Sequence, residues 1–283
     1  KGRMIAVTGV SGSGKTSLVI ECLVPALQAV IQGTKLPEHV DSIEAKGIQS
    51  VKVIDSKPIG ANVRSTVATY DGVFDDLRKL RTADAKAKGL TAGDFSYNTG
   101  KLRCPVCDGT GIITMDVQFL PDVDTICPSC GGSRYGKDAY DILWKSKEKD
   151  SVSVSLPGLL KLTVEEAAGI LHEETKIAKQ LKILQDLGVC YLTLGEATPA
   201  LSGGEAPRLK LAYEMETPQQ GSVFVFDEPT IGLHPQDVKK LVLIFDHLIQ
   251  LGATVIVIEH DLELVTNCDY IIDMGPWGGT EGG

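Results

Sequence analysis

A phosphate-loop motif close to the start of the chain is the feature that most constrains the fold. It reads Gly9-Val-Ser-Gly-Ser-Gly14-Lys15-Thr16, after an apolar strand at residues 4–8 and before an amphipathic helical pattern. In this context backbone N–H groups surround phosphates, the Lys15 ammonium lies on the outer two phosphates, and the Thr16 hydroxyl binds Mg²⁺. The motif predicts an α/β fold that binds ATP and Mg²⁺ through these loop residues: Gly9, Ser11, Gly12, Ser13, Gly14, Lys15 and Thr16.

Two further phosphate-related motifs come late in the chain. The apolar run at residues 222–226 is typical of a buried parallel strand, and it ends in Asp227-Glu228. We expect Asp227 to hold Mg²⁺ through water and Glu228 to polarise the water that attacks the γ-phosphorus. The next strand, at residues 253–258, is followed by His260, which we expect to sense the γ-phosphate. A histidine at a strand end is often structural, but its place after the other motifs favours the functional role.

Four cysteines form two C-x-x-C pairs, Cys104 with Cys107 and Cys127 with Cys130, and 19 residues separate the pairs. Thiolates with this spacing bind one tetrahedral Zn²⁺ at about 2.3 Å each and fold a small module around it. The alternative is two disulfides or four buried thiols, but we see no secretory signal, and a cytoplasmic thiol pool keeps cysteines reduced. We therefore expect a zinc module at about residues 100–137 and a cytoplasmic location.

The composition restricts the partners. Of the 283 residues, 43% are hydrophobic and 23% are charged, as in ordinary soluble domains. The longest apolar stretches have strand length, well below the roughly 20 residues of a membrane-spanning helix, so we expect no membrane role. The net charge of -9 argues against nonspecific attraction to nucleic acid, although it allows a local basic patch.

A further motif precedes a helical pattern in the last third of the chain. It reads Leu201-Ser202-Gly203-Gly204-Glu205, and its Ser-x-x-Glu spacing is that of a capping box. Placed between Lys15 and Asp227, it resembles the signature of the ATP-binding-cassette family. The resemblance implies that Ser202, Gly203, Gly204 and Glu205 face the ATP of a second cassette. That cassette is either the other half of the same protein or a second copy of this chain.

Within that family, a four-cysteine module between phosphate loop and signature is similar to the UvrA branch, the damage-recognition ATPases of bacterial nucleotide excision repair. The similarity covers nearly the whole chain and looks like the C-terminal cassette. Besides the motifs above, it is carried by Pro58-Ile-Gly60, Arg64-Ser65, Ala68-Thr-Tyr70, Phe95-Ser-Tyr-Asn98, Phe119-Leu-Pro-Asp122, Arg134-Tyr135, Asp227-Glu-Pro-Thr230, Gly232-Leu-His234 and Ile258-Glu-His260.

This resemblance implies a cassette-type phosphate-loop sheet with an inserted, mainly helical signature subdomain that carries the zinc module. We expect the ATP-binding core at residues 1–55 and 201–283 and the signature subdomain at residues 56–200. Helical patterns lie near residues 73–80, 138–144, 164–172 and 176–187, and a connection rich in Lys, Ala and Gly lies at residues 83–93. The chain itself is expected to be a fragment of a longer protein.

The implied ligands are damaged double-stranded DNA and, through the missing half, a UvrB-like partner. Lys101, Arg103, Arg134 and Lys137 flank the cysteine pairs and are the candidates for phosphate contacts. Five aspartates share the module, so its DNA role rests on the resemblance: Asp108, Asp116, Asp122, Asp124 and Asp138. Tyr97 and Tyr135 are candidates for stacking on distorted bases, with simple packing beside the metal as the alternative.

Two departures from the UvrA pattern bear on the function. Ser56 stands where UvrA-like sequences carry a glutamine near Mg²⁺, and Pro207 replaces a glutamine five residues into the helical pattern that follows Leu201. The leading hypothesis is an ATPase that recognises DNA damage. The two departures favour a UvrA-like self-resistance or regulatory ATPase with slow turnover, and ordinary drift is the alternative. The ATPase subunit of a transporter is disfavoured because it has no use for the four cysteines.

Overall fold

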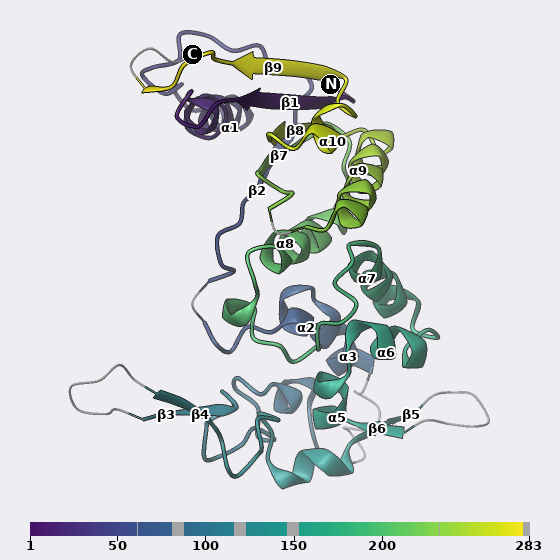
Figure 1. The fold of residues 1–283 in the computed structure, drawn as a ribbon. Helices are drawn as coiled ribbons and strands as arrows, with labels where there is room; N and C mark the ends of the chain where they lie inside the picture. The colour runs from purple at the N-terminus through teal and green to yellow at the C-terminus, as the bar shows by residue number, and fades with distance from the viewer. Residues whose placement is uncertain (61, 81–87, 116–122, 146–152, 232, 280–283) are drawn as a thin grey trace. The chain divides into compact units, whose positions relative to one another are not determined.

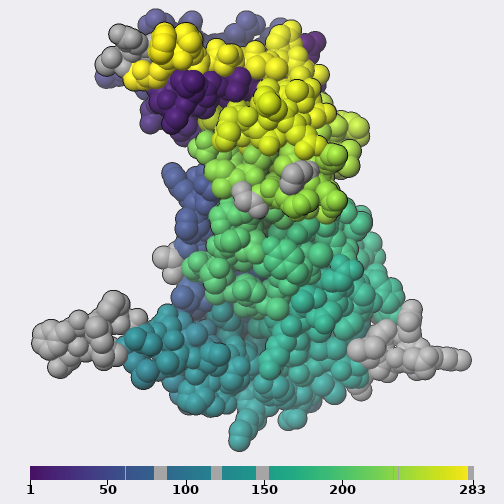
Figure 2. All heavy atoms as spheres, viewed as in Figure 1, coloured from purple at the N-terminus to yellow at the C-terminus, as the bar shows by residue number. Residues whose placement is uncertain are grey.

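The computed structural model describes residues 1–60, 62–80, 88–115, 123–145, 153–231 and 233–279 (Figure 1). The chain forms two compact units. Lys1–Lys57 and Ser202–Gly283 make up one, here called the core unit, and Pro58–Leu201 makes up the other, here called the inserted unit. The two ends of the chain thus belong to one unit, and they carry the purple and yellow colours in Figure 2.

A five-stranded parallel sheet organises the core unit and confirms the predicted α/β fold. Its strands follow the order β2-β7-β8-β1-β9, with the bounds Ser50–Ile54, Ser222–Asp227, Thr254–Ile258, Met4–Gly9 and Tyr270–Met274. The register pairs Ile54 with Phe226, and Ile258 with both Asp227 and Val7. Because parallel strands share one direction, the loops after β1, β2, β7 and β8 leave from the same edge of the sheet.

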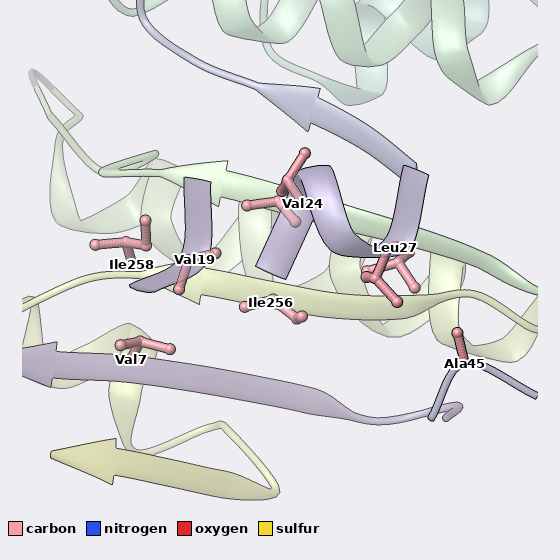
Figure 3. Close-up of a cluster of buried hydrophobic side chains, with 9 residues drawn as sticks. Val7, Val19, Val24, Leu27, Ala45, Ile256 and Ile258 are labelled. Atoms are coloured by element: carbon pink, nitrogen blue, oxygen red, sulfur yellow. The ribbon is translucent and has the colours of Figure 1, made fainter. Parts of the chain in front are cut away.

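Alternating side chains along β7 and β8 face two helical layers. Val225 and Ile256 belong to an apolar cluster that includes Val19, Val24 and Leu27 from the helical segment after the phosphate loop (Figure 3). One residue further along β7, Phe226 points the other way and packs on Phe245 of α9 (Pro235–Gln250), with ring centroids 4.5 Å apart. Helices cover both faces of the sheet, which explains why β7 and β8 are continuous apolar runs.

The helical segment after the phosphate loop consists of two parts. A π-helical stretch, η1 (Ser17–Leu23), leads into α1 (Val24–Gln32), which ends at Gly33 with φ 68°. Pro25 at the start of α1 has no N–H to donate to the carbonyl of Glu21, four residues earlier. His39 Nε2 lies 3.1 Å from that carbonyl oxygen instead. The core unit is completed by α8 (Glu205–Met215) and α10 (Leu262–Val265).

The inserted unit is mainly helical, as expected. Its helices are α2 (Val67–Tyr70), α3 (Val73–Leu80), η2 (Ala92–Phe95), η3 (Lys137–Asp141), α5 (Leu156–Lys161), α6 (Val164–Ile170), α7 (Thr175–Asp186) and η4 (Thr198–Ala200). Two antiparallel hairpins accompany them, β3 (Ile112–Met115) with β4 (Val123–Ile126) and β5 (Leu143–Lys145) with β6 (Ser153–Ser155). The expected helices α3, α6 and α7 are therefore confirmed.

The helix expected at residues 138–144 forms only in its first half. A short 3₁₀ turn, η3, is followed by β5, which pairs with β6. The local burial alternates, with Ile142 at 4% and Trp144 at 5% exposed on either side of Leu143 at 38%. This period of two is that of a strand and does not fit a helix.

Some sequence features lie outside the described residues, namely residues 83–87 of the connection at residues 83–93, residues 119–122 and Gly232. Within the part of the chain that the structure describes, no helix combines the length and the apolar character needed to cross a membrane.

Candidate nucleotide and metal sites

A cavity of about 560 Å³ lies at the sheet edge where the loops after β1, β7 and β8 meet. Its lining residues come from the phosphate loop and from the loops after β7 and β8: Gly9, Ser11, Gly12, Gly14, Lys15, Thr16, Ser17, Glu228 and His260. The two candidate catalytic residues, 32 positions apart in the sequence, thus face the phosphate loop. Asp227 and Ser13 are adjacent to lining residues in the sequence.

The phosphate loop depends on backbone conformations that only glycine adopts easily. Gly9, Gly12 and Gly14 have φ of 137°, 79° and 93°. A Cβ on Gly9 would lie 1.9 Å from the carbonyl oxygen of Met274 on the neighbouring strand β9, so no side chain fits there. The Lys15 ammonium donates to the carbonyls of Gly9 and Val10, each at 2.9 Å. Loop and lysine therefore form the cradle that nucleotide phosphates require.

Two carboxylates follow one another at the end of β7. Burial raises the pKa of Asp227, and the nearby charges of Glu228 and Asp55 raise it further. Bound Mg²⁺ would offset this repulsion, which fits the role expected of Asp227. Glu228 has φ of 49°, and its N–H donates to the Ile258 carbonyl at 3.0 Å. A non-glycine residue with positive φ is uncommon and often marks a functional site.

Glu259 is a site residue for which the sequence suggested no role. Its side chain is fully buried and accepts from the N–H and hydroxyl of Thr230 and from the N–H groups of His260 and Asp261. One carboxylate therefore ties the loop after Glu228 to the loop that carries His260. A carboxylate directly after an apolar strand was the available signal, but the strand pattern does not show which donors surround it.

Replacing Glu259 with Gln is expected to lower kcat for ATP hydrolysis by about tenfold with little change in KM for ATP. A carboxylate accepts at both oxygens, whereas an amide presents a donor at one end, so the contact either to Thr230 or to His260 and Asp261 is lost. Steady-state kinetics on the purified full-length protein would measure the effect. An unchanged kcat would show that the two loops keep their positions without this carboxylate.

The signature residues form the start of helix α8. Gly204 caps the helix, and the Glu205 carboxylate accepts from the Ser202 N–H at 2.7 Å, which is one half of the expected capping box. None of the residues 202–205 is among those that line the cavity. Pro207 is the third residue of α8, so it lies in the first turn and not in the helix interior. N–H groups in the first turn have no intrahelical partner, so proline is tolerated there.

The four cysteines converge in the inserted unit. Their sulfur atoms all lie within 4.8 Å of one another and all four residues are buried. The distances are 4.0 Å from Cys104 to Cys127 and 3.7 Å from Cys107 to Cys130, much longer than a disulfide bond. A tetrahedron with Zn–S bonds of about 2.3 Å has edges of about 3.8 Å, so the cluster fits Zn²⁺.

The electrostatics of the cluster favour a cation. Burial raises the pKa of Cys130 to about 12, with a contribution from the thiols of Cys107 and Cys127. Burial also acts on Cys104, but hydrogen bonds from the N–H groups of Cys107 and Val106 and from the thiols of Cys107 and Cys130 together lower the pKa of that thiol to about 7. Four neighbouring thiols cannot all ionise alone, whereas a bound Zn²⁺ stabilises every thiolate.

The structure corrects part of the DNA prediction. Arg134 is only 5% exposed, donates to the Val63 carbonyl at 3.0 Å and lies over the Tyr97 ring, so its guanidinium does not face solvent. Tyr97 and Tyr135 are buried and pack edge to face at 5.9 Å, so the base-stacking hypothesis is wrong and the packing alternative holds. Both rings fill the apolar core of the inserted unit.

The remaining basic candidates lie nearer the surface. Arg103 pairs with Asp108 at 2.8 Å, and its side chain is 38% exposed. Lys101 is 77% exposed and lies 3.6 Å from the carboxylate of Asp94. Lys137 begins the turn η3 and is exposed. These three side chains, unlike Arg134, remain accessible to a ligand.

Comparisons with known proteins find similarity to UvrA proteins along the whole chain. The chain is 43% identical over 285 residues to UvrABC system protein A of Staphylococcus aureus, and 45% identical over 289 residues to that of Clostridium acetobutylicum. These matches cover 99% and 100% of the chain but 29% and 30% of the relatives, so the chain spans less than a third of their length. The crystal structure of UvrA2 from Deinococcus radiodurans matches with a TM-score of 0.89 and 40% identity, over the whole chain and 34% of that protein. No protein-family model matches the chain.

Proposed function

We propose that this chain, which is UvrA-like along its whole length, forms one ATP-binding cassette of an ATPase that recognises DNA damage in nucleotide excision repair. The observation that carries the proposal is the cavity shared by Lys15, Glu228 and His260. It offers a cradle for phosphates, a carboxylate to polarise the attacking water and an imidazole beside the γ-phosphate position.

Each residue of this cavity has a part in phosphoryl transfer, which depends mainly on positioning and charge stabilisation. Lys15 and the loop N–H groups hold the phosphates of ATP, and Thr16 and Asp227 hold Mg²⁺, which neutralises developing charge. Glu228 accepts a proton from the attacking water as it reaches the γ-phosphorus. His260 donates a hydrogen bond to the transferred phosphoryl group.

The site is composite in this proposal. Residues 202–205 do not line the cavity in their own chain, which is consistent with a role in binding ATP on a second cassette. The N-terminal end of α8 suits an anion because its free N–H groups and helix dipole favour negative charge. The second cassette is the other half of the same protein or another copy of this chain, and a UvrB-like partner binds through that other half.

DNA binding belongs to the inserted unit in this proposal. Zn²⁺ holds the cysteine module rigid, and Lys101, Arg103 and Lys137 contact phosphates of a damaged duplex. The net charge of -9 requires such contacts to be local. Ser56 supports a variant of this function, a self-resistance or regulatory ATPase with slow turnover, because its side chain is too short to replace a glutamine near Mg²⁺.

The test measures ATP hydrolysis and DNA binding by the full-length protein at one controlled salt concentration, since affinity depends steeply on salt. With ATP and Mg²⁺ present, we expect hydrolysis and about tenfold tighter binding to a duplex with one bulky adduct than to the intact duplex, or about 1.4 kcal/mol. Equal affinity for the two duplexes would contradict the repair function, and slow but measurable hydrolysis with lesion preference would favour the regulatory variant.

A further inference from the structure

Lys210 in helix α8 makes three contacts with a single short segment. Its ammonium donates to the Asp55 carboxylate at 2.5 Å, to the Asp55 carbonyl at 3.0 Å and to the Lys57 carbonyl at 2.8 Å. An ammonium has three N–H donors, so all of them are engaged. The side chain of Lys210 is 16% exposed and that of Asp55 is 25% exposed, so solvent screens this ion pair less than a surface pair.

The segment that Lys210 holds lies beside the nucleotide chemistry. Residues 55–57 follow β2, which pairs with β7 so that Ile54 lies opposite Phe226. Asp55 therefore emerges next to Asp227, and its charge acts on that carboxylate. Ser56 lies between the two carbonyls that Lys210 binds. A second cation, Lys57, lies 3.7 Å from the Asp55 carboxylate but is 85% exposed, so it holds the segment less firmly.

We propose that Lys210 is a positioning residue that couples the signature helix to the Asp55–Ser56–Lys57 segment and so sets the geometry of the Mg²⁺ and water positions in the cassette's own nucleotide site. The inference rests on the proposed ATPase function. Helix α8 starts at the signature residues, five positions before Lys210, so a shift of this helix moves the anchor of the segment.

This coupling would connect Lys210 to two nucleotide sites, the one that its own cassette's phosphate loop forms and the one to which its signature residues contribute. Its helix presents residues 202–205 to the ATP of the second cassette, and its ammonium holds the loop next to Asp227 in its own site. ATP bound at the signature of this cassette therefore favours one position of the Asp55–Lys57 segment. Lys210 acts through that segment and does not touch the nucleotide.

The test compares Lys210→Met, Lys210→Arg and Asp55→Asn, and the double variant Asp55→Asn/Lys210→Met, in the full-length protein. Lys240→Met is the matched control, because Lys240 forms an exposed pair with Asp237 at 3.1 Å on α9 in the same unit. For Lys210→Met we expect kcat to fall about tenfold and half-saturating Mg²⁺ to rise, with ATP affinity within about threefold of wild type. Lys210→Arg should recover part of kcat because it keeps the charge.

The double variant separates positioning from general stability. Because Lys210 acts through Asp55, its combined loss with Asp55 should lower kcat by less than the product of the single effects. The proposal would be overturned if the two single effects on kcat multiplied in the double variant, or if the Lys210→Met protein were as active as the Lys240→Met control. It would also be overturned if Lys210→Met lost its affinity for ATP together with a large drop in the thermal unfolding midpoint. A wild-type protein that hydrolyses no ATP would contradict the proposed function and this role with it, whereas an active wild type with an unaffected Lys210→Met variant would contradict this role alone.

Discussion

Replacing Glu228 with Gln is expected to lower kcat for ATP hydrolysis by at least about 100-fold, while ATP affinity stays within a few-fold of wild type. The amide keeps the size of the side chain and the positive φ at this position, but it cannot take a proton from the attacking water. Lys15 and the phosphate loop, which bind the nucleotide, are unchanged. The protein should therefore hold ATP without turning it over.

The measurement combines single-turnover hydrolysis with equilibrium binding of ATP to the full-length protein. The matched control is Glu263→Gln on α10, whose carboxylate lies 3.6 Å from Lys239 at the surface of the same unit. That control should hydrolyse ATP like the wild type. If Glu228→Gln kept more than about a tenth of the wild-type kcat, another group would have to activate the water.

The second large effect concerns the cysteine cluster. Replacing Cys107 with Ser should remove most of the bound zinc and lower the free energy of unfolding of the inserted unit by about 3–5 kcal/mol. A hydroxyl is a much poorer Zn²⁺ ligand than a thiolate, and the other three buried thiols would then lack the cation that stabilises their charges. Zinc content by atomic absorption and unfolding in denaturant measure the two parts of this effect.

Cys190→Ser is the matched control for that variant, because Cys190 is a partly buried thiol of the inserted unit that lies outside the cluster. It should keep the zinc content of the wild type. Acidification should also release zinc, since Zn²⁺ must displace protons from thiols and the pKa of Cys130 is about 12 without the metal. Full zinc occupancy in the Cys107→Ser protein would contradict a four-thiolate site.

Local patterns in the sequence were sufficient for much of the fold. The phosphate loop needs its glycines because Gly9, Gly12 and Gly14 have positive φ, so the motif carries its own backbone requirement. Continuous apolar runs predicted β7 and β8, since both faces of these strands are buried. The second half of the helix expected at residues 138–144 is a strand instead, because a short apolar run fits helix and strand alike.

Several partnerships depend on residues distant in the sequence, and no local pattern reveals them. Arg134 was a candidate DNA contact because it flanks a cysteine pair, but its guanidinium is buried against the ring of Tyr97 and donates to the carbonyl of Val63. Glu259 connects two loops because the pairing of β7 with β8 brings Thr230 and His260 to the same carboxylate. Lys210 likewise meets Asp55 across 155 positions of sequence.

The sequence by itself determined which chemical groups this protein has: a phosphate cradle at Gly9–Thr16, two carboxylates after an apolar strand, and two pairs of thiols at zinc spacing. These are encoded locally, because each motif carries its own backbone requirement or ligand spacing. Only the tertiary structure decided which groups meet. The parallel sheet brings Lys15, Glu228 and His260 to one cavity, and burial removes Arg134 and Tyr97 from the surface, since neither strand order nor burial is a property of a short segment.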